Sequence, residues 1–294
     1  MKTTIASRLP ISRKAHQRYG ASRLFGNVTI HAVLIIAAII ALFPIYLMFN
    51  ASLKSSQELF QSIVAPPIAP RWSNFSLILV ERGYYRNVIN SFVLAASTTV
   101  ISVVLSVLAG YGFATYRFFG KQVLFITVLI GLMVSETSVL IPVYNLLQDL
   151  DLLNTRVGLI LPQVALGLAF GVFLMTTFFK EIPKSMLEAG IIDGCSDVQL
   201  LRYVIVPLSR PSIMSLGLIE FMWAWNSFFF PLVIATRQEV KPMSVSIIDF
   251  MGRFTFNYEL VATTTVIMFA PILVVYLLTQ RSFHQGITFG AIKE

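Results

Sequence analysis

The sequence predicts an all-α, polytopic membrane protein with six transmembrane helices, and two observations carry this prediction. The 294 residues are 56% hydrophobic and only 12% charged, whereas about 25% of residues are charged in an average soluble domain. The apolar residues fall in six separated blocks, each long enough to cross the roughly 30 Å hydrocarbon core as a helix. A single cysteine, Cys195, excludes an internal disulfide and a cysteine metal cluster.

The six expected spans follow one another along most of the chain. They are residues 28–50, 88–116, 123–147, 157–179, 212–235 and 261–280. The first block is longer than the apolar core of a secretory signal, which has about 7 to 15 residues, and it has no A-x-A exit, so we expect it to be retained as a span. The chain then divides into an N-terminal tail (1–27), a transmembrane domain (28–280) and a C-terminal tail (281–294).

Basic residues predict the orientation of these spans. Six of the twenty-two Lys and Arg residues precede the first apolar block, where no acidic residue occurs. Placing both termini in the cytoplasm puts fourteen of the twenty-two on the inside, which is the bias that cytoplasmic segments show. The net charge of +8 is therefore interpreted as a topology signal, and no nucleic-acid partner is expected.

Two of the expected outside segments, 51–87 and 236–260, are long. The first contains Ala65-Pro66-Pro67-Ile68-Ala69-Pro70, in which three of the six residues are proline. That proline density favours an extended surface connection over a helix. Both segments either contact an extracytoplasmic partner or cap the bundle.

The inside segment 180–211 is long and polar, and it carries its own helix signals. Pro183 suits the first turn of a helix that runs to about Asp193, and Gly194 ends that helix. Its apolar residues available for burial are Met186, Leu187 and Ile191. Ser196 and Gln199 form a capping-box pattern that starts a second short helix.

Two short amphipathic helices around a glycine turn can dock into a groove on another protein or lie on lipid. The segment 180–211 has four basic and four acidic residues. Its electrostatic attraction to anionic headgroups is therefore weak, which favours protein docking.

At these positions the sequence resembles the EAA loop of permease subunits in binding-protein-dependent ABC importers. The matching residues are Glu188-Ala189-Gly190, then Gly194, then Val204-Ile205-Val206-Pro207. The family has Ala at the position of Gly190, and Ile and Leu at the positions of Val204 and Val206. Further similarity to the maltose-type second permease of the carbohydrate-uptake branch is carried by residues 109–114, 141–144, 159–162, 225–226 and 286–293.

The resemblance implies that 180–211 is a cytoplasmic coupling loop that fits a cleft of an ATPase subunit. The coupling residues carried over from the family are Glu188, Ala189, Gly190, Asp193, Gly194 and Pro207. It also implies a second permease chain, two ATPase subunits, an extracytoplasmic solute-binding protein and a location in a bacterial or archaeal inner membrane, in contact with lipid. The chain itself is expected to have no enzymatic activity and to bind no cofactor. Gly120-Lys121 is not part of a phosphate loop, because Thr115 replaces the required glycine and Gln122 the required Ser or Thr. ATP and magnesium are expected in the partner ATPase.

Acidic residues within the spans are candidate substrate-pathway residues, because polar groups at bilayer depth are costly. Helical spacing places Glu220, Trp223 and Ser227 on one side of the fifth span, with Asn226 near its edge. These side chains either line a solute pathway or pack against a neighbouring helix. Glu136 is a weaker candidate, because the polar residues next to it indicate a helix break or the outer end of the span.

Two further patterns in the spans concern packing and metals. Gly167 and Gly171 form a small-xxx-small pair that favours close helix packing. The three histidines are too widely separated in the sequence for a metal site, and none is expected.

Three other classes of function remain as alternatives to a sugar or oligosaccharide importer subunit. A stand-alone secondary transporter would use Glu136 or Glu220 as its ion site. An intramembrane enzyme is disfavoured, because no nucleophile, base or metal-ligand motif is present in the sequence. An assembly subunit would bind partners without moving solute. The sequence does not name the solute, and neutral sugars, acidic oligosaccharides, sugar alcohols and glycerol phosphate all stay open.

Overall fold

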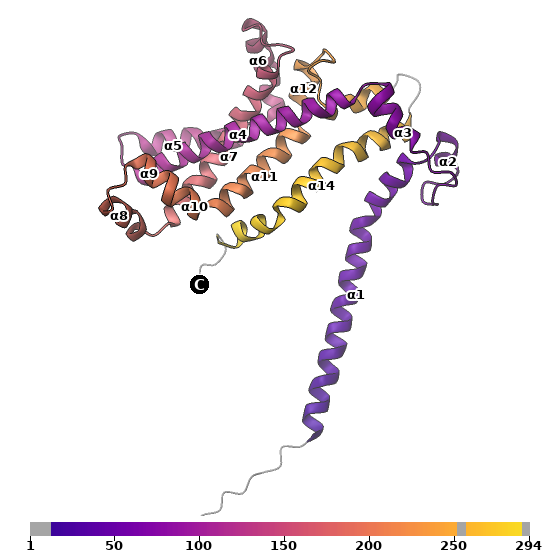
Figure 1. Ribbon diagram of the computed structural model, residues 1–294, viewed down its shortest axis with the longest axis horizontal. Helices are drawn as coiled ribbons and strands as arrows, with labels where there is room; N and C mark the ends of the chain where they lie inside the picture. Colours follow the sequence, from indigo (N-terminus) through magenta and orange to yellow (C-terminus); the bar gives the residue numbers. More distant parts are fainter. Residues whose placement is uncertain (1–12, 252–256, 290–294) are drawn as a thin grey trace, which may run out of the picture.

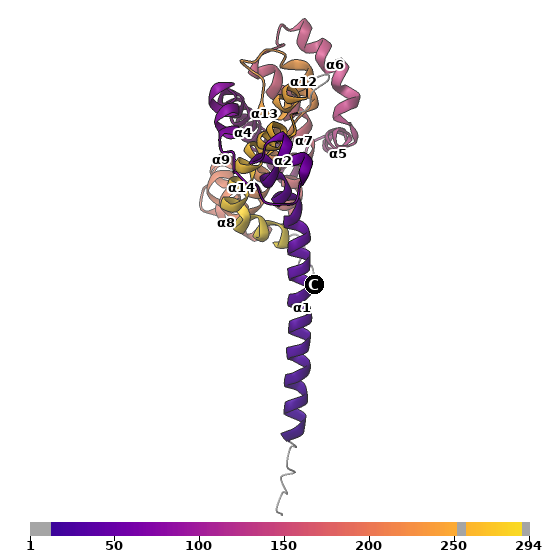
Figure 2. The same ribbon diagram turned by 90° about the vertical axis from the view of Figure 1, so that its right-hand side faces the viewer.

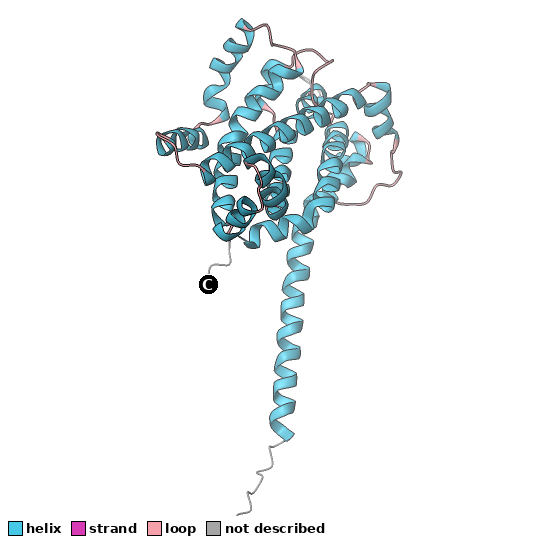
Figure 3. Cartoon of the chain, turned by 60° about the vertical axis from the view of Figure 1, so that its left-hand side comes forward, coloured by secondary structure: helices cyan, strands magenta, loops and turns pink. Residues whose placement is uncertain are grey.

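The computed structural model describes the backbone of residues 13–251 and 257–289, and the side chains of residues 30–251 and 257–280. Within these ranges the regular structure is helical and contains no β-strand (Figure 3). The predicted tails are therefore covered only in part, since 1–12 and 290–294 lie outside the described residues. The predicted all-α class is confirmed.

The helices differ widely in length (Figure 1). The longer ones are α1 (Arg13–Ser52), α4 (Tyr85–Thr115), α5 (Lys121–Ile130), α6 (Glu136–Asp149), α7 (Arg156–Glu181), α8 (Lys184–Ile192), α11 (Arg210–Asn226) and α14 (Tyr258–Phe289). The shorter ones are α2 (Ser56–Gln61), α3 (Ser73–Ser76), η1 (Leu77–Glu81), η2 (Gly131–Met133), α9 (Asp197–Leu200), η3 (Leu201–Ile205), α10 (Val206–Leu208), α12 (Phe229–Ile234), α13 (Met243–Ser246) and η4 (Ile247–Phe250).

Five helical segments of the described chain are long and apolar enough to cross a membrane: Ile30–Ser52, Tyr85–Thr115, Arg156–Glu181, Arg210–Ile234 and Tyr258–Gln280. They correspond to five of the six predicted spans. The third predicted span, 123–147, is instead two helical pieces, Lys121–Met133 and Glu136–Asp149, bent by 103°. The break lies at Val134 and Ser135, which have extended backbone angles, and it agrees with the helix break that the polar residues around Glu136 indicated.

The core of the bundle is formed by α4, α7 and α11, with α14 packed against α11. Glycines allow α4 and α7 to approach closely: Gly110 of α4 faces Met175, and Gly171 of α7 faces Ser106. A Cβ atom at either glycine would overlap with atoms of the facing helix, so this packing requires glycine at both positions. The predicted packing role of Gly171 is consistent with this contact.

Helix α1 packs against α14 at one end and otherwise extends away from the bundle (Figure 2). From Ile30 to Tyr46 its apolar side chains are exposed, and Ile40 is 68% exposed. Such a surface is unstable in water and requires lipid or another apolar surface around it.

The connection between α1 and α4 is held by hydrogen bonds to its backbone. The side-chain amide of Asn50 donates to the carbonyl oxygens of Ile63 and Ala65 at 2.8 and 2.9 Å. Lys54, only 2% exposed, donates to the carbonyl oxygens of Ser62 and Ala65. The proline-rich residues 66–70 that follow are non-helical, so the predicted extended connection is confirmed.

The connection between α12 and α14 is fixed to the start of α4. The side-chain amides of Asn87 and Asn90 donate to the carbonyl oxygens of Lys241 and Glu239 at 3.0 and 2.8 Å. The Tyr84 hydroxyl donates to Asp249 at 2.9 Å, and burial together with this hydrogen bond raises the pKa of Tyr84 to about 12. The phenol therefore stays protonated, as a donor, at neutral pH.

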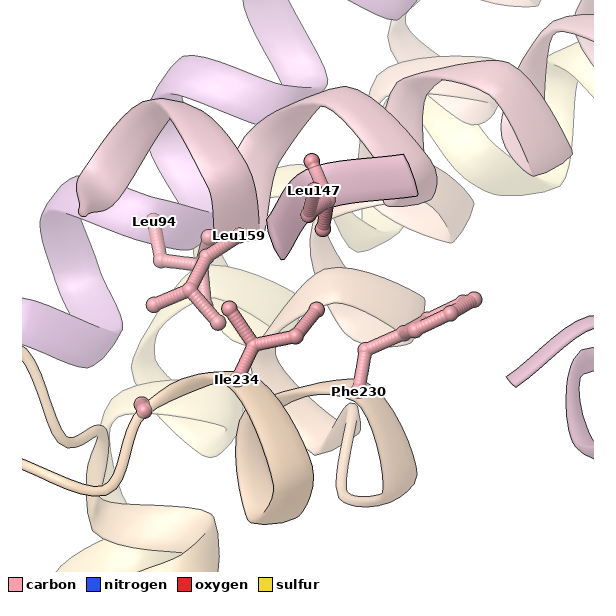
Figure 4. Close-up of a cluster of buried hydrophobic side chains, with 6 residues drawn as sticks. Leu94, Leu147, Leu159, Phe230 and Ile234 are labelled. Carbon is pink, nitrogen blue, oxygen red and sulfur yellow. The ribbon is translucent and has the colours of Figure 1, made fainter. Parts of the chain in front are cut away.

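A buried apolar cluster joins α4, α6, α7 and α12 (Figure 4). Its labelled members are Leu94, Leu147, Leu159, Phe230 and Ile234. Leu147 comes from α6 and Phe230 and Ile234 from α12, so this cluster fixes both broken segments against the bundle. The positions of α6 and α12 determine the shape of the cavity described below.

Candidate functional site

The first candidate site is the segment 180–211, which forms a compact protrusion at one end of the bundle (Figure 1). Helix α8 follows Pro183 and ends at Ile192, with Asp193 as its C-cap. Two backbone hydrogen bonds of 3.0 Å close the helix end, from Gly194 to the carbonyl of Ile191 and from Cys195 to the carbonyl of Gly190. This pattern is a Schellman motif, which satisfies carbonyl groups that have no partner within the helix.

Gly194 has φ of +81°, in the left-handed region, and a Cβ atom there would meet nothing within 4 Å. We therefore expect Gly194→Val to destabilise the turn by about 1–2 kcal/mol through backbone strain alone. Gly194→Asn should retain most of the stability, because asparagine tolerates this conformation. Protease cleavage of the loop in the purified protein measures the difference, and equal cleavage rates for both variants would contradict this account.

The predicted capping box is present at the start of α9. The backbone N–H of Ser196 donates to Oε1 of Gln199 at 2.8 Å. The chain then continues as η3 and α10, so the second predicted helix is irregular in its middle. Leu200 and Ile205 are the buried residues of this part, at 2% and 1% exposed.

Of the three apolar α8 side chains available for burial, this chain covers only one. Leu187 packs against the core, but Met186 and Ile191 are 46% and 61% exposed. The buried residue of α8 is instead Gly190, which packs against the Leu200 side chain. A Cβ atom at Gly190 would lie 2.7 Å from Cδ1 of Leu200, so alanine at this position would require a shift of the Leu200 side chain.

The remaining predicted coupling residues lie on the surface of the protrusion. Glu188, Ala189, Asp193 and Pro207 are exposed, as is Gly194. Ile192 and Val198 flank the turn and are 85% and 74% exposed. An exposed carboxylate surrounded by exposed apolar side chains is suited to bind another protein.

The protrusion is attached to the ends of several long helices. Ile205 packs in one cluster with Tyr111 of α4, Phe179 of α7 and Leu216 of α11. A side-chain hydrogen bond with Asp197 raises the pKa of Tyr116, the C-cap of α4, above its ordinary value. The protrusion therefore packs directly against the ends of α4, α7 and α11.

The second candidate site is a cavity of about 750 Å³ within the bundle. It is lined by residues of α4, α6, α7, α11, α12 and α14. All five predicted pathway residues line it: Glu136, Glu220, Trp223, Asn226 and Ser227. Helical spacing predicted that the four residues of the fifth predicted span lie together. The structure adds Glu136 of α6 to the same cavity.

The two carboxylates are held differently. Glu136 begins α6, and its Oε1 accepts a hydrogen bond of 3.4 Å from the backbone N–H of Phe230. Glu220 is 2% exposed, and its carboxylate lies in the notch left by Gly167 of α7. Gly167 is therefore needed for the placement of Glu220, which goes beyond the general packing role expected from the sequence.

Two polar residues of this cavity, Thr98 of α4 and Gln163 of α7, were not predicted from the sequence. Thr98 is 1% and Gln163 9% exposed, and the side-chain oxygen of Thr98 and both amide atoms of Gln163 have no hydrogen-bond partner within the described residues. The same holds for Oε1 of Glu220 and the hydroxyl of Ser227. An amide inside an apolar block was the available signal for Gln163.

These features define a class of protein: a multi-pass membrane protein with a mainly apolar cavity that carries a few polar residues, and with a surface loop joined to its helix ends. Residues 102–288 match the family model described as binding-protein-dependent transport system inner membrane component. This match spans more than half of the chain, which therefore belongs to that family.

Curated relatives agree with this assignment. The trehalose transport system permease protein of Mycobacterium tuberculosis is 31% identical over 86% of this chain and 93% of its own length. The arabinooligosaccharides transport system permease protein of Bacillus subtilis is 28% identical over 87% of this chain and 92% of its own. The predicted resemblance to the carbohydrate-uptake branch is confirmed.

A crystal structure of a bacterial ABC transporter involved in import of the acidic polysaccharide alginate has the same fold. Its matching chain is aligned with a TM-score of 0.75 at 24% identity, covering 96% of this chain and 100% of that one. The similarity extends along almost the whole length of both chains. The place of this chain as a maltose-type second permease stays a prediction.

Proposed function

We propose that this chain is a permease subunit of an ABC importer that moves a sugar or oligosaccharide across the inner membrane of a bacterium or archaeon. The observation that carries the proposal is the family match, together with relatives whose names specify trehalose and arabinooligosaccharides. Both termini and the segment 180–211 lie in the cytoplasm in this proposal, as the distribution of basic residues favours.

Coupling to a separate ATPase proceeds through the protrusion formed by residues 180–211. Glu188 and the exposed apolar side chains around Gly194 provide the docking surface. ATP and magnesium are bound by two ATPase subunits, whose closure moves α8. The contacts of Ile205 with α4, α7 and α11 then convert this movement into a change between inward-facing and outward-facing arrangements.

The other partners occupy the remaining surfaces. A second permease chain supplies the other half of the pathway and, with lipid, covers the exposed apolar side chains of α1. A solute-binding protein docks at the opposite end of the bundle, on the segments 51–87 and 236–260. Glu136, Glu220, Trp223, Asn226 and Ser227 form the part of the solute pathway that this chain contributes.

One observation favours a second candidate, a stand-alone ion-coupled transporter. Glu220 is buried, and its Oε1 has no hydrogen-bond partner in the described part of the chain. A carboxylate of this kind is typical of proton and cation sites in secondary transporters. An ion-coupled transporter does not require the protrusion formed by residues 180–211, whereas an importer subunit uses it to bind the ATPase.

Purification of the tagged chain from its native membrane tests the proposal. We expect a second permease and an ATPase to copurify, with ATP hydrolysis that rises when a solute-loaded binding protein is added. The unloaded binding protein is the control. Recovery of the chain alone, with ATP-independent uptake driven by an ion gradient after reconstitution, would establish the ion-coupled transporter instead.

A further inference from the structure

We propose that the cleft between the start of α5 and the end of α7 binds the phosphate headgroup of an anionic membrane lipid, with Lys121 and Lys180 as the residues that hold it. The cleft has a volume of about 1050 Å³, and its wall comes from α4, α5, α7 and the connection between α4 and α5. This inference rests on the proposed function only for the orientation, which places this end of the bundle at the cytoplasmic surface.

The cleft lies at the end of the bundle that carries the protrusion. Lys180 stands in the last turn of α7, directly before α8, and α5 lies at the same end as α8 and α9 (Figure 1). Tyr116, the exposed C-cap of α4, accepts a hydrogen bond from the Lys121 side chain through its carbonyl oxygen. Tyrosine is enriched at the level of the lipid headgroups, so its position indicates that the cleft opens at this level.

The wall of the cleft is positively charged. Among the described residues that line it, Lys121 and Lys180 are basic and none is acidic. The ion pair found in the described part of the chain joins Lys241 and Asp249, outside this cleft, so neither lysine is neutralised by a carboxylate of the described residues. Basic pockets between membrane helices on the cytoplasmic side are suited to anionic lipid headgroups.

The two lysines approach the same face of α5. Lys121 and Phe125 are four residues apart on this helix and therefore share a face, and Nζ of Lys180 lies 5.6 Å from the centroid of the Phe125 ring. Nζ of Lys121 donates to the Tyr116 carbonyl at 2.7 Å. An ammonium group has three N–H donors, so Lys121 keeps two for the oxygen atoms of a phosphate.

The N-terminus of α5 adds to this positive charge. The helix has 10 residues and begins at Lys121, with no acidic residue in its first turn and no side-chain cap. Backbone N–H groups without partners in the first turn, together with the positive end of the helix dipole, favour an anion at this place. The two ammonium groups and the helix end thus attract the same headgroup.

The apolar part of the wall distinguishes a lipid from a soluble phosphate. Phe113 is buried and packs against Phe118 and Phe125 with centroid distances of 6.1 and 5.2 Å. Val123 and Leu124 line the same cleft and are exposed. A soluble phosphate would leave this apolar surface uncovered, whereas the acyl chains of a lipid cover it. We therefore assign the cleft to a lipid.

The test measures which lipid lies against α5 in the assembled complex. The purified complex is placed in phosphatidylcholine nanodiscs that contain a small, equal fraction of either phosphatidylglycerol or phosphatidylcholine with a photoreactive acyl chain. After illumination, lipid adducts on residues 121–130 of this chain are quantified by mass spectrometry. We expect a yield at least about tenfold higher with phosphatidylglycerol, because each lysine near the membrane surface contributes to the attraction of an anionic lipid.

The double variant Lys121→Gln, Lys180→Gln should narrow this ratio to about threefold or less, because it removes both charges. Its yield with phosphatidylcholine should not change, which shows that the cleft is still open to lipid. Lys184→Gln, at an exposed lysine of α8 outside the cleft, is the matched control and should leave the ratio unchanged.

Equal yields with both lipids in the unmodified complex, or an unchanged ratio in the double variant, overturns the inference. Loss of the preference when inorganic phosphate is added at constant ionic strength would assign the cleft to a soluble anion and also overturns it. The orientation is tested separately with a protease site placed before Met1, which should be cut in inside-out vesicles and not in right-side-out ones. The opposite result refutes the orientation in the proposed function, and the two failures are distinguishable because both faces of a nanodisc are open.

Discussion

Glu188→Arg is expected to reduce ATP-driven uptake by at least about tenfold while the subunits stay assembled and ATP hydrolysis continues. Glu188 is exposed on α8, and no ion pair or side-chain hydrogen bond of Glu188 is present in the described part of the chain. Its replacement therefore costs little folding free energy, about 0.5 kcal/mol or less. Reversal of its charge instead places like charges at the proposed contact with the ATPase.

Uptake and ATP hydrolysis are measured on the same reconstituted complex, so that their ratio reports coupling. Glu188→Gln removes the charge and keeps the shape of the side chain. We expect its ratio of uptake to ATP hydrolysis to lie between those of the unmodified chain and Glu188→Arg. Copurification of the ATPase with the Glu188→Arg chain distinguishes lost coupling from lost assembly. Unimpaired uptake by Glu188→Arg would mean that α8 is not the coupling element.

Local signals predicted the protrusion well. Gly194 ends α8 in the left-handed region, and the Ser196 and Gln199 pair caps the next helix, because both features depend on residues within one turn of each other. Met186 and Ile191, two of the apolar residues available for burial, are exposed in the described chain. Amphipathic spacing identifies apolar side chains but does not say whether the chain supplies a surface to cover them, and here a partner is proposed to do so.

The cavity shows a different limit. Helical spacing placed Glu220, Trp223 and Ser227 together, since they share one helix face and its continuation. Glu136 reaches the same cavity only because the third apolar block is broken and bent by 103°, and the angle of a break depends on packing with α7 and α12. Thr98 and Gln163 come from other helices, so no spacing rule within one segment identifies them.

Gly110→Ala is expected to destabilise the helix bundle by about 1–3 kcal/mol, the usual cost of overpacking. A Cβ atom at Gly110 of α4 would lie 2.6 Å from Cβ of Met175 and 3.1 Å from backbone atoms of Met175 and Thr176 in α7. Met175 is 0% and Thr176 1% exposed, so neither can move aside into free space. The two helices must separate, and the contacts that join the protrusion to both of them weaken.

Gly112→Ala on the same helix is the matched control, because a Cβ atom there meets nothing within 4 Å. Alanine in place of glycine favours a helix by about 0.5–1 kcal/mol, so the two substitutions should change stability in opposite directions. The fraction of this chain that stays soluble after heating in detergent gives the midpoint temperature of unfolding for each variant. Equal midpoints for Gly110→Ala and Gly112→Ala would show that α4 and α7 do not meet at Gly110, and the route from the protrusion to the cavity would then have to run through α11 alone.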